Sequence, residues 1–226
     1  MAEGVLDEAG HEQVSAAVAA AEAHSAGEIV TILADRSDDY SDVALAWSIL
    51  GAFLALTALS LASDAFLGMI DRVLGTWAMT WTAHAALTLA ALVAMLKFAA
   101  IWLLLLWPRL RLLLVPPPLK EARVRARAVA AFRIGAERRT QGRTGILLYL
   151  SLAEHRAEIV ADEAVASRVS PEVWGEAMAA MIGHLKDGRT AQGLVAAVER
   201  VGAVLAEHLP RDPADVNELP DRLIEL

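Results

Sequence analysis

The chain has 226 residues, 56% of them apolar, and a formal net charge of −8. It contains no cysteine, which excludes a disulfide framework, a thiol nucleophile and a cysteine-ligated metal. The charge is unevenly distributed: residues 1–42 carry ten acidic residues and one basic residue, whereas residues 109–143 carry ten basic residues and two acidic ones. The first 25 residues are acidic and lack the apolar segment of a signal peptide, so we expect none there.

The N-terminal region predicts a helix followed by a strand. Residues 1–26 are expected to form one amphipathic helix with Asp7 as its cap, and Glu22 falls outside the apolar stripe. Glu28–Ala34 is an apolar run rich in β-branched residues, which predicts a strand buried on both faces. The apolar stripe of the helix consists of Val14, Val18 and Ala21.

Two long apolar segments predict a transmembrane hairpin. Val43–Ala62 has 20 residues without a charge, and Ala83–Trp107 has 25 residues with one charge, Lys97. At about 1.5 Å per residue, 20 helical residues span about 30 Å, the thickness of the hydrocarbon core of a bilayer. The alternative is a pair of buried helices in a soluble protein, which rarely run this far without a charge. The role of Lys97 stays open between a functional charge, a helix contact and snorkelling to the interface.

The segment between the two spans has the composition of a membrane interface. Residues 63–82 combine apolar positions with few charges, so they could form an interfacial helix. A third span is excluded because Asp71 and Arg72 would lie in its middle. Tryptophan is enriched where a membrane meets water, and the expected interfacial anchors are Trp77, Trp81 and Trp107.

A basic and proline-containing segment follows the second span. Residues 108–118 are expected to form a linker that ends in a stiff spacer of three prolines. Leu119–Arg139 then predicts a helix with one basic face and an apolar stripe. This stripe consists of Val124, Ala128 and Phe132.

The C-terminal part predicts a β-hairpin and two helices. Ile146–Leu152 and Ala157–Ala161 are expected to pair antiparallel across a short turn. Ser170, followed by Pro171, is expected to cap a helix. Thr190 is expected to cap the last helix. The buried side of that last helix is predicted to consist of Leu194, Val198, Val201 and Leu205.

The distribution of basic residues predicts the orientation of the hairpin. The positive-inside rule counts Lys and Arg near the ends of the spans. Arg109, Arg111 and Lys120 follow the second span, whereas the segment between the spans offers only Arg72. We therefore expect a multi-pass membrane protein with both termini and the soluble domain in the cytoplasm.

The soluble parts on either side of the hairpin predict one domain. Residues 1–42 hold one helix and one strand, which is too little for a separate core. Residues 119–226 supply the other strands and helices. We expect one α/β domain, made of residues 1–42 and 119–226, that is interrupted by the hairpin at 43–107 and by the linker at 108–118.

Acidic residues follow two of the predicted strands and form a candidate metal site. Carboxylates from several loops could hold Ca²⁺ or Mg²⁺, although ordinary solvated loops and a helix cap are the simpler explanation of these acids. The six histidines are scattered and include no HExxH motif, which argues against zinc. No GxSxG nucleophile motif is present. The candidate ligands are Asp35, Asp38, Asp39, Asp162 and Glu163.

The basic segment after the second span predicts contact with a membrane surface. Nucleic acid is an unsuitable partner because the rest of the domain is acidic and carries no binding motif. Anionic lipid headgroups attract such a segment by about 1 kcal/mol per basic residue near the surface. The residues expected to contact headgroups are Arg109, Arg111, Lys120, Arg123 and Arg127.

Two segments resemble a known family. Residues 20–30 (AAEAHSAGEIV) resemble the opening helix and first strand of TPM-domain proteins, and residues 143–156 (RTGILLYLSLAEHR) resemble their central hairpin. Ala161-Asp162-Glu163, Trp174 and the tail at 217–221 are similar to the bacterial integral-membrane branch of that family. The resemblance implies an α/β/α fold with a small mixed sheet and a location in the bacterial inner membrane.

The resemblance leaves the activity open. Acid phosphatase activity and calcium binding are attributed to some TPM-domain proteins, and relatives in the thylakoid lumen take part in photosystem II repair. This chain departs from their pattern at residues 142–145 (GRTG) and 162–165 (DEAV), which weakens any transfer of such a site. We expect a non-enzymatic module that binds a protein partner in the membrane or maintains envelope proteins. The alternative is a weak metal-assisted phosphohydrolase.

Overall fold

The chain divides into two compact units. A computed structural model describes residues 6–74, 81–135, 144–211 and 222–226. One unit, the sheet unit, joins Met1–Asp38 to Pro117–Leu226, and the other, the hairpin unit, is Asp39–Pro116. The domain boundaries expected from the sequence, after residues 42 and 118, differ from these by a few residues. The chain therefore leaves the sheet unit once and returns to it once.

The sheet unit is built on a mixed four-stranded sheet. The first two strands along the chain are parallel neighbours, with Ile29 opposite Ile146, and the second and third form the predicted antiparallel hairpin, with Leu148 opposite Ile159. The mixed α/β fold expected from the sequence is confirmed. In spatial order the strands are β3 (Arg156–Ala161), β2 (Gly145–Ser151), β1 (Glu28–Ala34) and β4 (Ile224–Glu225).

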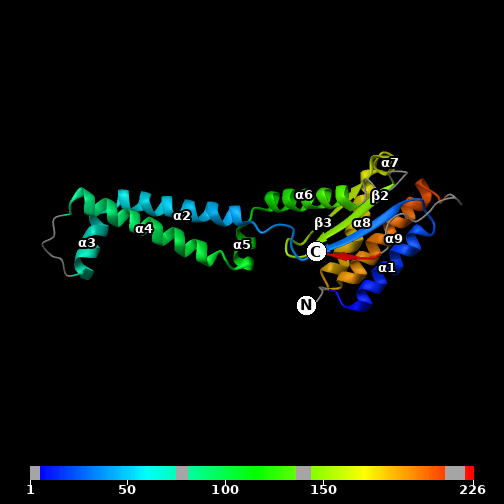
Figure 1. Cartoon of the computed structure of the whole chain (residues 1–226), viewed down its shortest axis with the longest axis horizontal. Coiled ribbons are helices and arrows are strands. Elements are labelled where there is room, and N and C mark those ends of the chain that lie inside the picture. The colour runs from blue at the N-terminus through cyan, green and yellow to red at the C-terminus, as the bar shows by residue number, and fades with distance from the viewer. Residues whose placement is uncertain (1–5, 75–80, 136–143, 212–221) are drawn as a thin grey trace. The chain divides into compact units, whose positions relative to one another are not determined.

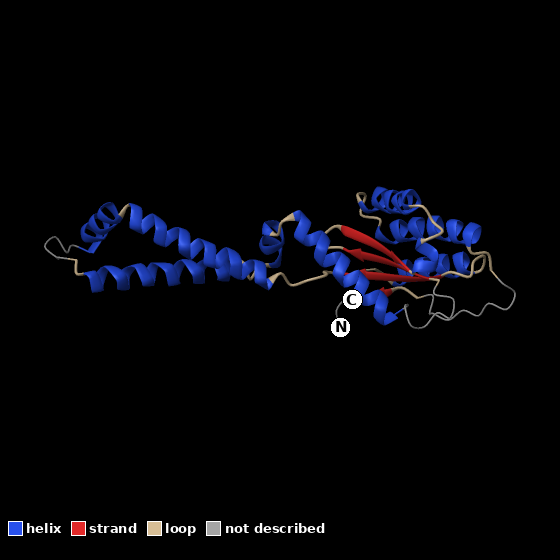
Figure 2. Ribbon diagram, turned by 90° about the horizontal axis from the view of Figure 1, so that it is seen from above, coloured by secondary structure: helices blue, strands red, loops and turns tan. Residues whose placement is uncertain are grey.

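Helices cover both faces of this sheet, as Figures 1 and 2 show. One core lies between the sheet and three helices, and the other lies between the sheet and a single helix. All seven residues of β1 and all seven of β2 are buried, as expected for strands covered on both faces. The three helices of the first core are α1 (Glu8–Glu22), α8 (Pro171–Leu185) and α9 (Thr190–His208), and the single helix is α6 (Pro117–Gly135).

The apolar stripes predicted from helical spacing are the ones that the sheet unit buries. The stripe of α6 packs on the side of Val30, Ile32 and Tyr149, and the stripe of α9 packs on the side of Ile29 and Leu148. The side chains with no exposed surface include Val14, Val18, Val124, Ala128, Leu194, Val198, Val201 and Leu205. Glu22, which was expected outside the stripe, is also buried, and its carboxylate accepts a 2.7 Å hydrogen bond from the Ile29 amide.

The structure corrects several expected details of the chain between the elements. The prolines do not form a spacer: Pro117 begins α6, because proline fits the first helical turn, where its missing N–H is not needed. The Ser170 side chain makes no capping hydrogen bond, and Thr190 is the first residue of α9 rather than its cap. Three short elements were not expected, namely α5 (Pro108–Leu114) within the expected linker, α7 (Glu163–Ala166), and β4, which pairs with β1.

The hairpin unit contains the two long apolar helices, α2 (Ser41–Leu61) and α4 (Ala83–Leu104). Both are long and apolar enough to cross a membrane, with mean hydropathies of 2.0 and 2.2. Only 17% and 0% of their most apolar windows are buried, unlike the core helices of a soluble protein. The two helices pack closely, since a Cβ atom at Gly51 would lie 2.1 Å from the Ile101 side chain. The same unit holds α3 (Ser63–Leu74) and α5 (Pro108–Leu114).

The division into two units predicts that the sheet unit folds without the hairpin. Replacing Asp39–Pro116 with a flexible Gly/Ser linker should yield a soluble protein that unfolds cooperatively on heating, because both cores lie in the sheet unit. Circular dichroism would follow the transition. As a control, Leu194→Asp in the shortened chain should abolish it, since that side chain has no exposed surface. A shortened chain without a cooperative transition at any linker length would show that the sheet unit needs the hairpin.

Candidate functional site

Four polar side chains meet at the edge of the sheet where β1 and β2 end, which we name the carboxyl edge. Ser37 follows β1, Tyr149 and Ser151 belong to the last part of β2, and Glu154 lies in the turn to β3. Ser37 Oγ lies 3.1 Å from the Tyr149 hydroxyl oxygen and donates to Ser151 Oγ at 2.8 Å. Parallel strands bring their carboxyl ends to one edge, which is also where open α/β sheets bind ligands.

These hydrogen bonds form a directional chain that ends at a buried carboxylate. Ser151 donates its hydroxyl proton to Glu154 Oε2, and Ser37 donates its own to Ser151. Because the Ser37 proton is used in this way, Tyr149 is the donor in its contact with Ser37. The Ser37 amide also donates to the Glu154 carboxylate, at 3.1 and 3.3 Å. These hydrogen bonds therefore hold the loop after β1 against the β2–β3 turn.

The carboxylate at the end of this chain is almost completely enclosed. Ser151 has no exposed surface, and Glu154 is 5% exposed. An ionised carboxylate is stable in such a place only when donors surround it, as the Ser37 amide and the Ser151 hydroxyl do here. The geometry assigns Glu154 a positioning role for the loops of the carboxyl edge.

Burial sets the protonation of Tyr149. Removal from water raises the pKa of its phenol above the ordinary value, and the charge of Glu154 raises it further. The hydrogen bond with Ser37 and the nearby Arg127 guanidinium act in the opposite direction without cancelling the effect of burial. Tyr149 is therefore a neutral hydrogen-bond donor at physiological pH.

Two ion pairs connect α6 to the same edge. Arg123 Nη1 lies 3.0 Å from Asp38 Oδ2, and Arg156 Nη1 at the start of β3 lies 3.4 Å from Glu121 Oε2. Both pairs are partly exposed, so each contributes at most about 1 kcal/mol. Their main effect is to hold the start of α6 beside the end of β1.

A further carboxylate, Glu158 of β3, faces the basic helix. Its Oε2 atom lies 4.0 Å from Arg125 Nη1. Burial is the largest cause of the raised pKa of Glu158, Glu121 raises the pKa further, and Arg125 and Arg156 lower it. The ion pair is thus too long to offset the loss of hydration.

The structure does not bring the five predicted metal ligands together. Asp35 and Asp38 lie at the carboxyl edge, and Asp39 is the next residue of the chain. Asp162 and Glu163 follow β3, which runs antiparallel to β2, so they lie at the opposite edge of the sheet, where Asp162 accepts a 3.1 Å hydrogen bond from the Gly145 amide. Seven strand residues, about 20 Å, separate the two edges.

No other set of described residues replaces that expected site. Within the described ranges, no group of three or more His, Asp or Glu side chains could hold a metal ion. The acids that were expected to bind Ca²⁺ or Mg²⁺ instead serve the fold, since Asp38 pairs with Arg123 and Asp162 ties the start of β2 to the end of β3. The expected cluster fails because the sequence does not reveal that β1 pairs parallel with β2, which places the end of β1 and the end of β3 at opposite edges of the sheet.

The residues expected to contact lipid headgroups fall in both units. Arg109 and Arg111 belong to α5 in the hairpin unit, whereas Lys120, Arg123 and Arg127 belong to α6 in the sheet unit. Arg123 is held by Asp38, which leaves it less available to lipid. The others are exposed or half-buried.

The expected aromatic anchors have different environments. Trp107 is 69% exposed at the end of the second apolar helix. The Trp81 indole N–H donates to the Asp71 carboxylate, at 3.2 and 3.3 Å, and so ties the start of that helix to α3. Trp77 lies outside the described residues. The expected interfacial helix is present as α3, whose Met69 and Val73 are exposed.

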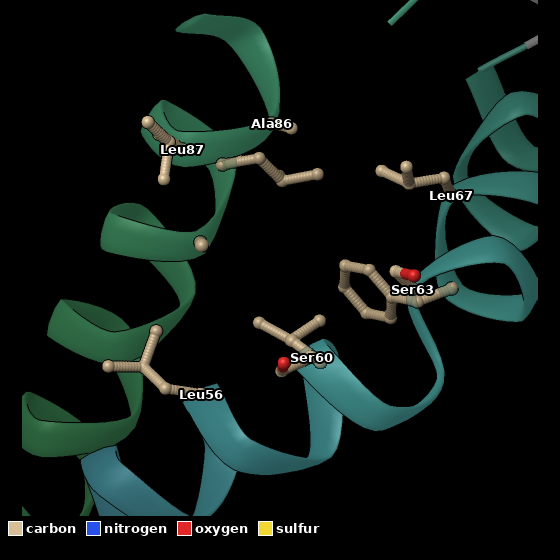
Figure 3. Close-up of a pocket in the computed structure, with 10 residues that line it drawn as sticks. Leu56, Ser60, Ser63, Leu67, Ala86 and Leu87 are labelled. Atoms are coloured by element: carbon tan, nitrogen blue, oxygen red, sulfur yellow. The ribbon is translucent and has the colours of Figure 1, made fainter. Parts of the chain in front are cut away.

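An apolar hollow of about 240 Å³ lies between α2, α3 and α4 (Figure 3). Phe66 and Leu67 of α3 and Leu87 of α4 contribute to its wall, and Ser60 and Ser63 supply its hydroxyl groups. Such a lining suits a hydrocarbon chain better than a charged molecule. The hollow therefore has the chemistry of a surface that faces lipid.

Sequence analysis missed the polar chain of the carboxyl edge. Ser37 lies in the polar segment after β1 and Glu154 in the short turn after β2, whereas Tyr149 and Ser151 belong to a strand that is otherwise apolar. Tyr149 and Ser151 alternate with leucines in β2, and this spacing was the available signal, because side chains two apart share one face of a strand. Nothing in the sequence indicated that Ser37 would meet them.

Comparison with known proteins finds a family match in part of the chain. Residues 111–204 match the family model described as the TPM domain. The chain carries a TPM domain. This match begins within α5, after the second apolar helix, and most of it lies in the longer of the two segments that form the sheet unit.

A solved structure shows the fold of the chain. The NMR structure of the BA42 protein from the psychrophilic bacterium Bizionia argentinensis superposes with a TM-score of 0.57 at 17% identity. The alignment covers 100% of this chain and 99% of that chain. At this identity the likeness establishes the fold alone. No curated protein matches the chain.

The enclosed carboxylate predicts a large stability effect. Glu154→Ala should lower the free energy of unfolding of the TPM domain by about 2–3 kcal/mol, because it leaves the Ser37 amide and the Ser151 hydroxyl without their acceptor. Urea denaturation of the shortened chain would measure the change. As a matched control, Glu163→Ala at an exposed position should change it by less than about 0.5 kcal/mol. Equal effects of the two variants would refute the positioning role of Glu154.

The raised pKa of Tyr149 predicts a pH effect. In the folded protein the pKa of its phenol should lie above the ordinary value of 10.0, whereas in the unfolded chain the phenol ionises near that value. The stability that it contributes is therefore complete below pH 10 and is lost as the pH rises through the folded pKa. The chain has two tyrosines, so an ultraviolet titration of tyrosinate resolves this step, and Tyr149→Phe should remove it. Ionisation of Tyr149 at or below its ordinary pKa would contradict the expectation.

Proposed function

We propose that this chain is an integral protein of the bacterial inner membrane that holds its TPM domain at the cytoplasmic face as a non-enzymatic binding module. The observation that carries the proposal is the hairpin of α2 and α4, inserted between two neighbouring strands of the domain. The helices have 21 and 22 residues, or about 32 Å each at 1.5 Å per residue. This length matches the hydrocarbon core of a bilayer.

The flanking helices support insertion into a membrane. The amphipathic α3, between the spans, carries charges at Asp64, Asp71 and Arg72 and exposes apolar side chains, as interfacial helices do. At the other end of the hairpin, α5 combines Arg109 and Arg111 with exposed leucines. Arginines at such a position keep their guanidinium groups among phosphates while their stems lie in apolar surroundings.

The basic residues support the cytoplasmic orientation. Arg109, Arg111 and Lys120 follow the second span, and Arg127 is exposed on α6. By the positive-inside rule this end of the hairpin lies in the cytoplasm, where anionic lipids attract the basic residues. The chain leaves the TPM domain and returns to it at this end of the hairpin. The TPM domain is therefore proposed to lie on the cytoplasmic side of the membrane.

The carboxyl edge supports binding rather than catalysis. Its one enclosed carboxylate, Glu154, is engaged by donors from the loops, and its partly exposed Asp38 pairs with Arg123. Acids held in this way shape a surface and are poorly placed to accept protons or ligate ions. A rigid edge formed by loops is suited to recognise a partner protein in or at the membrane.

Cysteine labelling tests both insertion and orientation, since the chain has no cysteine of its own. Gly68→Cys in α3 should react with a membrane-impermeant maleimide in intact cells, because the segment between the spans then lies outside the cytoplasm. Gly175→Cys in α8 should react only after lysis. Both glycines are exposed, and a Cβ atom at either would have no neighbour within 4 Å, so neither substitution should disturb the fold.

The labelling experiment also separates the ways in which the proposal can fail. Extraction at alkaline pH should leave the protein in the membrane fraction, as expected for spanning helices. Labelling of Gly175→Cys but not of Gly68→Cys in intact cells would show that the orientation is opposite to the proposed one. Release of the protein by alkaline extraction would refute the membrane insertion itself.

A further inference from the structure

Lys97 is the one charged residue within either apolar span, and the structure places it at the border of the helix pair. Its helical neighbours four residues away on either side, Val93 and Ile101, are half-buried, and Ile101 packs against Gly51 of α2. Lys97 itself is exposed. Its side chain therefore emerges beside the contact between α2 and α4, on a surface that an additional helix could cover.

The depth of Lys97 makes this position costly unless the charge is compensated. It lies fourteen residues after Ala83 and seven residues before Leu104, or about 21 Å and about 10 Å along α4. Within the described residues, no acidic side chain forms an ion pair with it. An ammonium group at such a depth costs about 3 kcal/mol or more when it faces lipid.

Snorkelling compensates this charge poorly because of the direction of the helix. Side chains on an α-helix tilt toward its N-terminus, so Lys97 is directed toward the end of α4 that is about 21 Å away, beyond the reach of its four-carbon stem. The nearer end of α4, at Leu104, lies in the direction opposite to this tilt. A carboxylate within the membrane would pair with the ammonium group, and Lys97 would then not have to reach toward either end of α4.

A second copy of this chain cannot supply that counter-charge. Val43–Ala62 and Ala83–Trp107 contain no Asp or Glu, Asp42 lies in the first turn of α2 at the proposed cytoplasmic end, and the acids of α3 lie beyond the far end of α4. A symmetric pair of hairpins would instead bring two Lys97 side chains into one interface. The charge therefore has to be matched by a different protein.

We propose that Lys97 marks the docking site for a transmembrane helix of another protein that carries an Asp or Glu at the depth of Lys97. This helix packs along α4 beside its contact with α2, and its carboxylate pairs with the Lys97 ammonium. The inference rests on the proposed membrane insertion and gives the partner of the binding module a stated chemistry. Such pairing is how ionisable groups within membranes are usually satisfied.

Photo-cross-linking in intact membranes tests the site with a matched control on the same helix. A benzophenone amino acid at Ala100, about 60° around α4 from Lys97, should cross-link the full chain to the partner helix. The same amino acid at Met95, about 160° around the helix at nearly the same depth, should not. Both positions are exposed.

The charge requirement is tested with variants of Lys97 in the Ala100 background. Lys97→Met should reduce the cross-linked product at least about tenfold, which corresponds to about 1.4 kcal/mol, and Lys97→Arg should retain it. The cross-linked segment should contain an Asp or Glu within an apolar stretch. Exchanging the charges, with Lys97→Asp in this chain and Lys in place of the partner's carboxylate, should restore cross-linking.

Several outcomes would overturn the proposal. A product that is unchanged in Lys97→Met, a product that contains a second copy of this chain, or cross-links to lipid alone would each refute it. The labelling of Gly68→Cys and Gly175→Cys is measured on the same membranes. Failure of that labelling would refute the membrane insertion, whereas correct labelling with a Lys97-independent product would refute the docking site alone.

Discussion

The structure depends on the pairing of β1 with β2, two parallel neighbours that are separated in sequence by the whole hairpin unit. Parallel strands require a crossover that carries the chain from the carboxyl edge back to the amino edge. Helix α6 provides it: its 19 residues cover about 28 Å, enough to return along a strand of seven residues. The chain is thus a βαβ unit into which the hairpin is inserted between β1 and its crossover helix.

This insertion explains why an ion pair and several hydrogen bonds hold the loops at the carboxyl edge. The chain leaves the sheet unit after Asp38 and returns at Pro117, and the Arg123–Asp38 ion pair joins the exit to the returning helix. The hydrogen bonds from Tyr149 through Ser37 and Ser151 to Glu154 then hold the exit loop against the β2–β3 turn. One buried carboxylate therefore organises the place where the chain leaves the sheet unit.

The direction and pairing of the strands explain which parts of the fold and of the candidate site the sequence could reveal. The elements that carry their own periodicity were predictable: β1 was assigned to its correct residues, and Val124, Ala128 and Phe132 of α6 are buried as expected. The candidate metal site was not, because Asp35 and Asp162 each follow a strand but lie at opposite edges of the sheet. The two-residue β4 was missed since its pairing with β1 arises from contact rather than from any pattern of its own.

By itself, the sequence determined the α/β class, the two apolar spans, the buried stripes and the TPM resemblance, because each is written in local spacing, hydropathy or short motifs. Only the tertiary structure decided which acids meet, that Glu22 and Glu154 are buried acceptors rather than solvated side chains, and that Lys97 is exposed beside the contact of α2 with α4. These properties depend on strand direction and on the rotation of one helix against another. Packing of distant segments sets both, and no local pattern encodes them.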